Sequence, residues 1–483
     1  MKKESLFEAI GDIDPDSVKK ARDYKGRKKP VWAAWIAIAA CAVIIVGAVW
    51  GIPAIRKTGR AGSNPPYPAG LMTVMAVYPA PVDPELSAEA FMQSEAHWNW
   101  WKSYRELVSK TEGLQRGMDA YNSAMMSRLL MSENENTVCS PLSIYIAFAM
   151  LAEVSDGNTR QQILDMLGAA GIEQLRTNVS ALWESNYADT PVLKSLLANS
   201  VWLDNRVKYH EDTLNSLAEN YYASAFSGTP GSAEMDEALR AWTDANTGGL
   251  LGEYTKEMSI DPQTVLELLS TVYYKAMWVD EFREENTAQE VFHGTSGDTT
   301  VDMMHKTDVM GVYSTDRFLS LGLNLNDSGA MHFFLPNEGT DVNALPSDPS
   351  VMAALRFDEK GENRSFPLVH LSVPRFKVSG KTDLVETVRA LGLTDALDPE
   401  LSDFTPLTAE RDGLCLSKAE HAAMIEIDEH GVTGAAYTEL ALSDGALRSD
   451  GEIDFVLDRP FMFIVTGRDG SILFSGIVRN IDG

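Results

Sequence analysis

The residues with the clearest chemical meaning lie near the C-terminus. They form a segment whose peptide bonds could be cleaved, and they supply no catalytic side chains. Over residues 432–443 the side chains alternate: one set is small or apolar throughout, and the other holds the only charge. Such period-two alternation marks a segment that can bury one face in a sheet. The first set is Val432, Gly434, Ala436, Thr438, Leu440 and Leu442, and the second is Thr433, Ala435, Tyr437, Glu439, Ala441 and Ser443.

The same segment is followed by a loop. Residues 431–459 contain no proline, so no backbone donor that a sheet ladder needs is missing. Residues 443–450 are predicted to form the loop, with turn signals at Asp444-Gly445 and Asp450-Gly451. The chain therefore joins a strand that a sheet can accept to an exposed segment that a protease can cleave.

Patterns for catalysis are missing from the sequence. It contains no Gly-x-Ser-x-Gly elbow, no His-Glu-x-x-His, no phosphate-binding loop and no Gly-x-Gly-x-x-Gly. The eight histidines are scattered without the spacing of metal ligands. His421 lies in a strand that we expect to be buried, which favours a core histidine over a ligand or a base. We therefore expect no enzyme, no metal site and no cofactor.

Start and stop signals predict the helices that surround this segment. Ser140-Pro141 begins one helix, because serine suits the N-cap and proline at the first helical position loses no needed donor. Asn158 or Thr159 opens a second helix, which Gly168 closes. Residues 383–391 form a third unit of the same kind, ending before a glycine.

Strands are predicted late in the chain. Residues 369–378 form one, and residues 461–478 form a hairpin that turns at Asp469-Gly470. Strands and helices alternate irregularly along the chain, which is typical of a mixed α+β domain.

Six groups of residues form an ordered set of motifs: Asn136 to Ile144 with Ser140-Pro141, Gly157 to Ile163 with Leu167-Gly168, Val272 to Trp278, Pro374-Arg375-Phe376, His421 with Ile425-Glu426, and Asp458 to Phe461 with Ile472 to Gly476. In order and spacing this set resembles the serpin family, and the resemblance covers residues 114–483. It implies a serpin-like α+β fold with three β-sheets, eight or nine helices and an exposed reactive-centre loop.

The resemblance assigns the alternating segment to the hinge of the reactive-centre loop. Val432 stands where the family usually has threonine, and Tyr437 where it has a small residue. On insertion Val432 would point inward, where an apolar side chain is tolerable, and Tyr437 would point outward. The hinge residues are Glu429, Gly431, Val432, Thr433, Gly434, Ala435, Ala436 and Thr438.

The bond to be cut is placed by counting along the loop. The family's usual distance puts it between Gly445 and Ala446, and cleavage after Leu442 or Arg448 stays open. A bond after Leu442 would suit chymotrypsin- or subtilisin-like proteases, and one after Arg448 a trypsin-like protease.

Further positions follow from the resemblance. It places Trp278 at the breach, where insertion of the loop begins. Ser270 stands where the family usually has asparagine, and serine can still donate and accept hydrogen bonds. The predicted sheet-opening region comprises Ser140, Ser143, Ser270 and His421.

The function that the resemblance implies is suicide inhibition of serine or cysteine proteases by a cleaved loop that inserts into the central sheet. A non-inhibitory serpin-fold surface protein that binds a ligand or partner is the alternative, favoured by Val432, Tyr437 and Ser270. Inward charge or proline in the hinge would have strengthened that alternative, and neither is present.

Composition limits the partners. The chain has 483 residues and a formal net charge of -28, which would repel the phosphates of nucleic acid. We expect a monomer without a nucleic-acid partner. Three cysteines, Cys41, Cys139 and Cys415, give no disulfide framework, although a Cys139–Cys415 bridge is conceivable.

The N-terminal region predicts a membrane anchor. Residues 31–55 carry no charge and are long enough to span the hydrocarbon layer as one helix. Seven lysines and arginines at positions 19–29 precede this stretch and fewer follow it closely, so the positive-inside rule places residues 1–30 in the cytoplasm and the large domain outside the cell. A cleaved signal peptide and a lipoprotein site at Cys41 are weaker alternatives, because apolar residues continue beyond Cys41. These features suggest a bacterial surface protein.

Residues 56–113 are predicted to form a proline-rich stalk. Within it, residues 88–112 predict a helix with a tryptophan-rich centre. These aromatic side chains could pack on the domain or touch the membrane, and packing on the domain is favoured.

Overall fold

The computed structural model describes residues 69–356, 363–410, 413–432 and 450–481. The chain divides into two compact units, residues 1–58 and 59–483, and all described residues belong to the second. Within them no helix is both long and apolar enough to cross a membrane. The expected tail and membrane span, at residues 1–55, lie outside the described residues.

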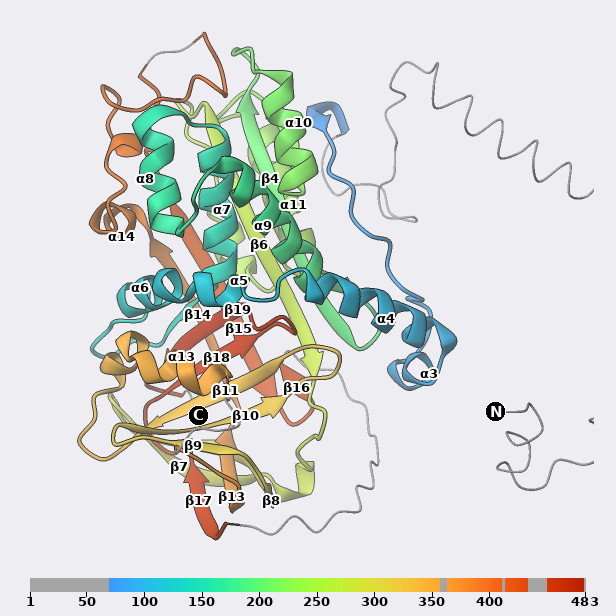
Figure 1. Cartoon of the computed structure of the whole chain (residues 1–483), viewed down its shortest axis with the longest axis vertical. Coiled ribbons are helices and arrows are strands. Elements are labelled where there is room, and N and C mark those ends of the chain that lie inside the picture. Colours follow the sequence, from blue (N-terminus) through green and yellow to red (C-terminus); the bar gives the residue numbers. More distant parts are fainter. Residues whose placement is uncertain (1–68, 357–362, 411–412, 433–449, 482–483) are drawn as a thin grey trace, which may run out of the picture. The chain divides into compact units, whose positions relative to one another are not determined.

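Three β-sheets build the described unit (Figure 1). The central sheet has the strand order β1 (Met72–Val74), β5 (Ala223–Gly228), β4 (Leu193–Asp204), β6 (Leu266–Met277), β16 (Gly431–Val432), β15 (Glu420–Asp428) and β14 (Phe376–Asp383), with β3 (Ala188–Asp189) beside β4. The second sheet has the order β12 (Arg364–Ser365), β9 (Val312–Ser314), β10 (Phe318–Asn324), β11 (Ala330–Pro336), β18 (Phe461–Thr466), β19 (Ile472–Val478) and β2 (Thr137–Cys139). The third has the order β17 (Glu452–Val456), β13 (Leu368–Pro374), β8 (Gly297–Val309) and β7 (Ala288–Gly294).

The described residues contain twelve α-helices, more than the eight or nine expected. The long ones are α4 (Glu95–Ser109), α6 (Asp119–Leu129), α7 (Pro141–Glu153), α8 (Gly157–Leu167), α9 (Ile172–Asn186), α10 (Glu211–Asn220), α11 (Ala233–Asn246) and α13 (Pro349–Arg356). The other four are short: α3 (Ala88–Met92), α5 (Leu114–Gly117), α12 (Gly252–Thr255) and α14 (Val385–Ala390). Of these, α3 lies within the helix predicted for residues 88–112 and α14 within the unit predicted for residues 383–391, whereas α5 and α12 are too brief to show a helical period in sequence. Four 3-10 turns add η2 (Ala69–Leu71), η3 (Glu284–Asn286), η4 (Val342–Ser347) and η5 (Asp395–Leu397).

The predicted helix signals mostly appear where expected. Ser140 caps α7 by accepting a hydrogen bond from the Ser143 N–H, and almost the whole of α7 is buried. Gly168 closes α8 in the left-handed conformation with φ 69°. The predicted start of α8 was wrong by a few residues: the N-cap is Asp156, not Asn158 or Thr159.

The strand predicted for residues 369–378 is two strands in two different sheets. β13 ends at Pro374 in the third sheet and β14 begins at Phe376 in the central sheet, so that Arg375 lies at the crossing between them. The β18–β19 hairpin forms as predicted, with Gly470 at φ 84° in its turn.

From residue 69 onward the expected stalk lies against the domain. β1 pairs with β5 at the edge of the central sheet, and the Tyr78 ring packs on Trp183 with centroids 5.4 Å apart. The predicted helix 88–112 is two helices, because Ser94 caps α4 by accepting from the His97 N–H. The aromatic side chains of α4 differ in exposure: Tyr104 is buried, whereas Trp98 is 62% exposed.

The two described cysteines are free. Cys139 is buried in β2 and Cys415 is exposed, which excludes the conceivable Cys139–Cys415 bridge.

Candidate functional site: the hinge and the central sheet

The first two residues of the predicted insertable strand already lie inside the central sheet as β16. Val432 pairs with Ile427 of β15 on one side and with Ala276 of β6 on the other, and both pairings are antiparallel. The Val432 side chain is fully buried, which is the inward orientation that the alternation predicts. Several predicted positions lie outside the described residues: Thr433, Gly434, Ala435, Ala436, Thr438, Leu442, Gly445, Ala446 and Arg448.

Glycine is the only residue type that fits at position 431, where the chain enters β16. A Cβ at Gly431 would lie 2.2 Å from the Ala276 carbonyl oxygen and 2.9 Å from the Met277 Cα. Both of these are backbone atoms of β6, which cannot move aside without breaking the sheet. The glycine therefore permits the close approach by which β16 enters between its neighbours.

Beyond β16, along β6 and β15, the central sheet has a gap. β6 and β15 run parallel to each other, since each is antiparallel to β16, and within the described residues no ladder joins them directly. A cavity of about 30 Å³ lies at this gap, lined by residues of α7, β6 and β15. An extended segment that continues from Val432 would enter between two strands whose facing edges carry free ladder positions.

The four predicted sheet-opening residues meet at the start of α7. The Ser140 N–H donates to His421 Nε2 of β15 at 2.9 Å. The Ser143 hydroxyl donates to the Ser270 carbonyl oxygen of β6 at 2.9 Å and lies 3.2 Å from its hydroxyl. One helix terminus is thus bonded to both strands that flank the gap, so moving these two strands apart would require at least one of these hydrogen bonds to break.

His421 accepts in this arrangement, so its ring is neutral. Burial lowers its pKa from 6.5 to about 4, because no carboxylate compensates for the lost hydration of a charged ring. His421 and the three serines are among the thirteen residues that line the small cavity, so part of its wall is polar.

Trp278 lies at the end of the gap next to β16, directly after the last residue of β6. Its indole N–H donates to the Asp428 carbonyl oxygen at 2.9 Å, and its backbone N–H donates to the His430 carbonyl oxygen at 3.0 Å. The side chain is almost completely buried. Trp278 therefore holds the end of β6 against the turn that joins β15 to β16.

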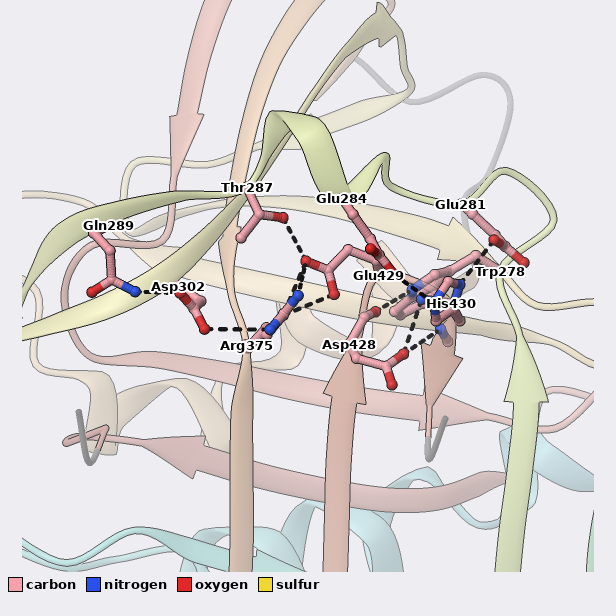
Figure 2. Close-up of polar contacts among 11 residues, drawn as sticks. Trp278, Glu281, Glu284, Thr287, Gln289, Asp302, Arg375, Asp428, Glu429 and His430 are labelled. Carbon is pink, nitrogen blue, oxygen red and sulfur yellow. Dashed lines mark hydrogen bonds and ion pairs between the residues drawn. The ribbon is translucent and has the colours of Figure 1, made fainter. Parts of the chain in front are cut away.

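An ion pair that sequence reasoning missed fixes the same turn. Arg375 donates from Nε to both Glu429 carboxylate oxygens, at 2.9 and 2.8 Å, and from Nη2 to one of them at 2.6 Å (Figure 2). Thr287 adds a hydrogen bond to the Glu429 carboxylate. Burial alone would raise the pKa of Glu429, but the bonds from Arg375 and Thr287 outweigh it and lower that pKa.

The remaining turn residues are also held. The Asp428 carboxylate accepts from the backbone N–H groups of His430 and Gly431. The His430 ring lies between Glu281 and Glu284, which belong to the segment that follows β6 (Figure 2). In the sequence, Pro374-Arg375-Phe376 was recognised only as part of a family resemblance, and no local signal in it pairs Arg375 with Glu429.

The fold and the site define a class of α+β protein with three sheets, in which the short strand β16 lies between β6 and β15 at one end of a gap in the central sheet. Comparison with known proteins agrees. The family described as "Serpin (serine protease inhibitor)" matches residues 117–481, and the chain belongs to that family. Serpins are protease inhibitors rather than enzymes, in line with the missing catalytic motifs.

Relatives match over most of their length. Serpin-ZX from Arabidopsis thaliana is 29% identical over 363 residues, covering 72% of this chain and 93% of the relative. The thermophilic serpin tengpin in its native state has a similar fold, with TM-score 0.67 and 22% identity over 76% of this chain and 93% of that one. Human thyroxine-binding globulin complexed with thyroxine gives a TM-score of 0.66 at 23% identity, covering 76% and 99% of the two chains. None of the three bears on a membrane anchor or a bacterial origin.

Proposed function

We propose that this chain inhibits serine or cysteine proteases by presenting its loop as a bait substrate and inserting the cleaved loop into the central sheet. The observation that carries the proposal is β16: Gly431 and Val432 already lie between β6 and β15, in the register that a longer inserted strand would continue.

The chemistry belongs to the protease. Its serine or cysteine nucleophile attacks the carbonyl carbon of the bait bond, the C–N bond breaks, and the new amine leaves with a proton. An acyl-enzyme then joins the protease to the loop residue on the N-terminal side of the cut. The bait bond is Gly445–Ala446, with the bonds after Leu442 and Arg448 as alternatives.

Insertion supplies the driving force. Each inserted residue gains backbone hydrogen bonds from the strands on both sides of the gap, and the inward set of side chains is small or apolar, so nothing charged has to be buried. Loop insertion of this kind is a known conformational switch that releases stored strain. Inhibition results when insertion is faster than the attack of water on the acyl-enzyme.

The test uses the full-length protein in mild detergent with chymotrypsin-, elastase-, subtilisin- and trypsin-like proteases. Denaturing gels detect a covalent adduct, and mass spectrometry locates the cut. A stable adduct with one protease, cut between Leu442 and Arg448, is the expected result. Cleavage in that range with no adduct from any protease would contradict inhibition.

A second candidate is binding of a small polar ligand. A cavity of about 270 Å³ lies among α5, α6, α13 and the β18–β19 turn. In the described residues, Gln115 Nε2 and Asn122 Oδ1 at this cavity are buried without a hydrogen-bond partner. Thyroxine-binding globulin shares the fold and was crystallised in complex with thyroxine. Ligand binding without adduct formation, abolished by Asn122→Leu, would favour this function.

We also propose that residues 31–55 anchor the chain in the cell membrane, with residues 1–30 in the cytoplasm, the inhibitory domain outside and the protein acting as a monomer. The uncharged stretch and the basic residues before it support this topology. Deletion of residues 31–55 should move the protein from the membrane fraction to the soluble fraction. Retention of the deleted chain in membranes would contradict the anchor.

A further inference from the structure

His430 occupies the two-residue turn between β15 and β16, and both of its ring nitrogens face carboxylates. Nδ1 lies 3.1 Å from Glu281 Oε2, and Nε2 lies 3.4 Å from Glu284 Oε1 (Figure 2). Both carboxylates come from the segment that follows β6. His430 and Glu281 are partly buried, with 23% and 18% of their side chains exposed, whereas Glu284 is 72% exposed.

While both glutamates are ionised, the geometry fits a charged ring. Neutral imidazole has one N–H donor and one bare nitrogen, and a bare nitrogen facing a carboxylate oxygen is repelled by it. The imidazolium donates from both nitrogens and satisfies both contacts. Burial opposes the charge, but Glu281, Asp428 and Glu284 outweigh it and raise the pKa of His430 above 6.5.

The other charges around the turn are already paired. Arg375 binds Glu429 and Asp302 and so does not face the histidine ring (Figure 2). Lys306 binds Asp280, the neighbour of Glu281. Asp428 accepts from two backbone N–H groups of the turn and adds negative potential beside the ring.

The ion pairs join the same elements that insertion must keep aligned. The backbone already connects the turn to the segment after β6, because the Trp278 N–H donates to His430 and the Phe282 N–H donates to Glu429. The His430 ring adds a charged contact between the β15–β16 hairpin and the end of β6. This contact holds Gly431 and Val432 in the position from which a longer strand would grow.

We propose that His430, held as an imidazolium between Glu281 and Glu284, is a positioning residue that closes the hinge turn and makes loop insertion faster in mildly acidic than in alkaline solution. The proposal rests on the proposed inhibitory function for its consequence, but the closed turn itself does not depend on any protease.

The pH window follows from the two groups. His430 has a raised pKa, so its contribution is complete below 6.5 and is lost as the pH rises through the raised value. The pKa of Glu281 is also raised, by burial more than His430 lowers it, so the pair weakens again as the pH falls through that value from above. The turn is held best in the interval between the two values.

Amide hydrogen exchange on the full-length protein tests the closed turn directly. Peptides that span residues 425–432 report the amides of β16, and rates are corrected for the intrinsic pH dependence of exchange. Protection should fall about threefold to tenfold between pH 6 and pH 8.5 in the natural sequence. His430→Gln and the double variant Glu281→Gln/Glu284→Gln should both show low protection without this pH dependence.

A matched control is His293→Gln, which removes a histidine paired with Asp298 on the third sheet. It should retain the pH profile of the natural sequence. The proposal is overturned if His430→Gln and the natural protein lose protection in parallel, or if the double carboxylate variant keeps the full pH dependence. Should the profile behave as expected while no protease forms an adduct, the closed turn stands and the inhibitory function fails.

Discussion

Arg375 and Glu429 form a bidentate ion pair in which the Glu429 side chain is 2% exposed and the Arg375 side chain is 42% exposed. Arg375 lies where the chain crosses from β13 of the third sheet to β14 of the central sheet. Glu429 lies in the turn that starts the insertable strand. The pair therefore ties the start of the loop to the junction of two sheets.

Removal of the arginine should weaken this connection. Arg375→Ala leaves a buried carboxylate without its cation, and we expect a loss of about 2 kcal/mol in the free energy of unfolding, below the range for fully buried pairs because Arg375 is partly solvated. Equilibrium denaturation measures the loss. In the double variant Arg375→Ala/Glu429→Gln the loss should be smaller, because the stranded charge is gone. A loss below about 0.5 kcal/mol for Arg375→Ala would contradict this account.

Ser270→Asn should stabilise the closed sheet. Asparagine is the family's usual residue here, and its longer amide would fill part of the cavity of about 30 Å³ beside Ser143 and His421. We expect a gain of about 1 kcal/mol from added hydrogen bonding, together with slower loop insertion. Ser270→Ala, which removes the hydroxyl without filling space, is the control and should not stabilise. Equal stability of the two variants would show that the cavity does not accept the amide.

The two faces of α4 should respond differently to truncation. Tyr104 is 3% exposed and stacks on Trp100 with ring centroids 4.8 Å apart, whereas Trp98 is 62% exposed. Tyr104→Ala should lower the free energy of unfolding by about 3 kcal/mol or more. Trp98→Ala should change it by less than about 0.5 kcal/mol. Similar small effects at both positions would mean that α4 does not contribute to the stability of the domain.

The buried His421 ring should make the folded protein less stable in acid. The unfolded chain binds a proton at this ring below about pH 6.5, but the folded protein does so only near pH 4. Unfolding therefore takes up a proton in that interval, and stability falls as the pH falls, by up to about 3 kcal/mol from this group. His421→Gln should flatten the pH dependence of the denaturation midpoint between pH 6.5 and 4. An unchanged slope would show that another group is responsible.

Local signals in the sequence located much of this fold. The Ser140-Pro141 helix start, the Gly168 helix end and the β18–β19 hairpin depend on residues within a few positions of one another, and each appears in the structure. The break at Pro374 went unpredicted, although the apolar side chains move from odd positions (369, 371 and 373) to even positions (376 and 378) where the strand changes sheet. The helix predicted for residues 383–391 appears as the shorter α14, whereas α5 and α12 have four residues each and hence no readable period.

The site was predicted unevenly for a similar reason. Ser140, Ser143, Ser270 and His421 were grouped by resemblance, and the structure brings them together around α7. The partners of the hinge turn were not predicted. Arg375 and the two glutamates beside His430 are distant in sequence from the turn, and charged residues in exposed segments carry no pattern that names their partner. Only the folded chain places them together.

The inward and outward hinge positions offer a matched pair of variants. Val432 is fully buried between β6 and β15, so Val432→Arg would place an unpaired charge in the sheet and should abolish adduct formation while cleavage continues. Thr433→Arg belongs to the alternate set of the sequence pattern and should leave trapping largely intact. Equal loss of trapping in both variants would argue against alternation as the basis of insertion.

The central claim is that the cleaved loop enters the gap between β6 and β15. The most direct measurement is the thermal unfolding midpoint of the full-length protein before and after a single cut between Leu442 and Arg448. Insertion adds a strand bonded on both sides, and the midpoint should rise by on the order of 10 °C, with no rise in Val432→Arg. An unchanged or lower midpoint after cleavage of the natural sequence would contradict loop insertion.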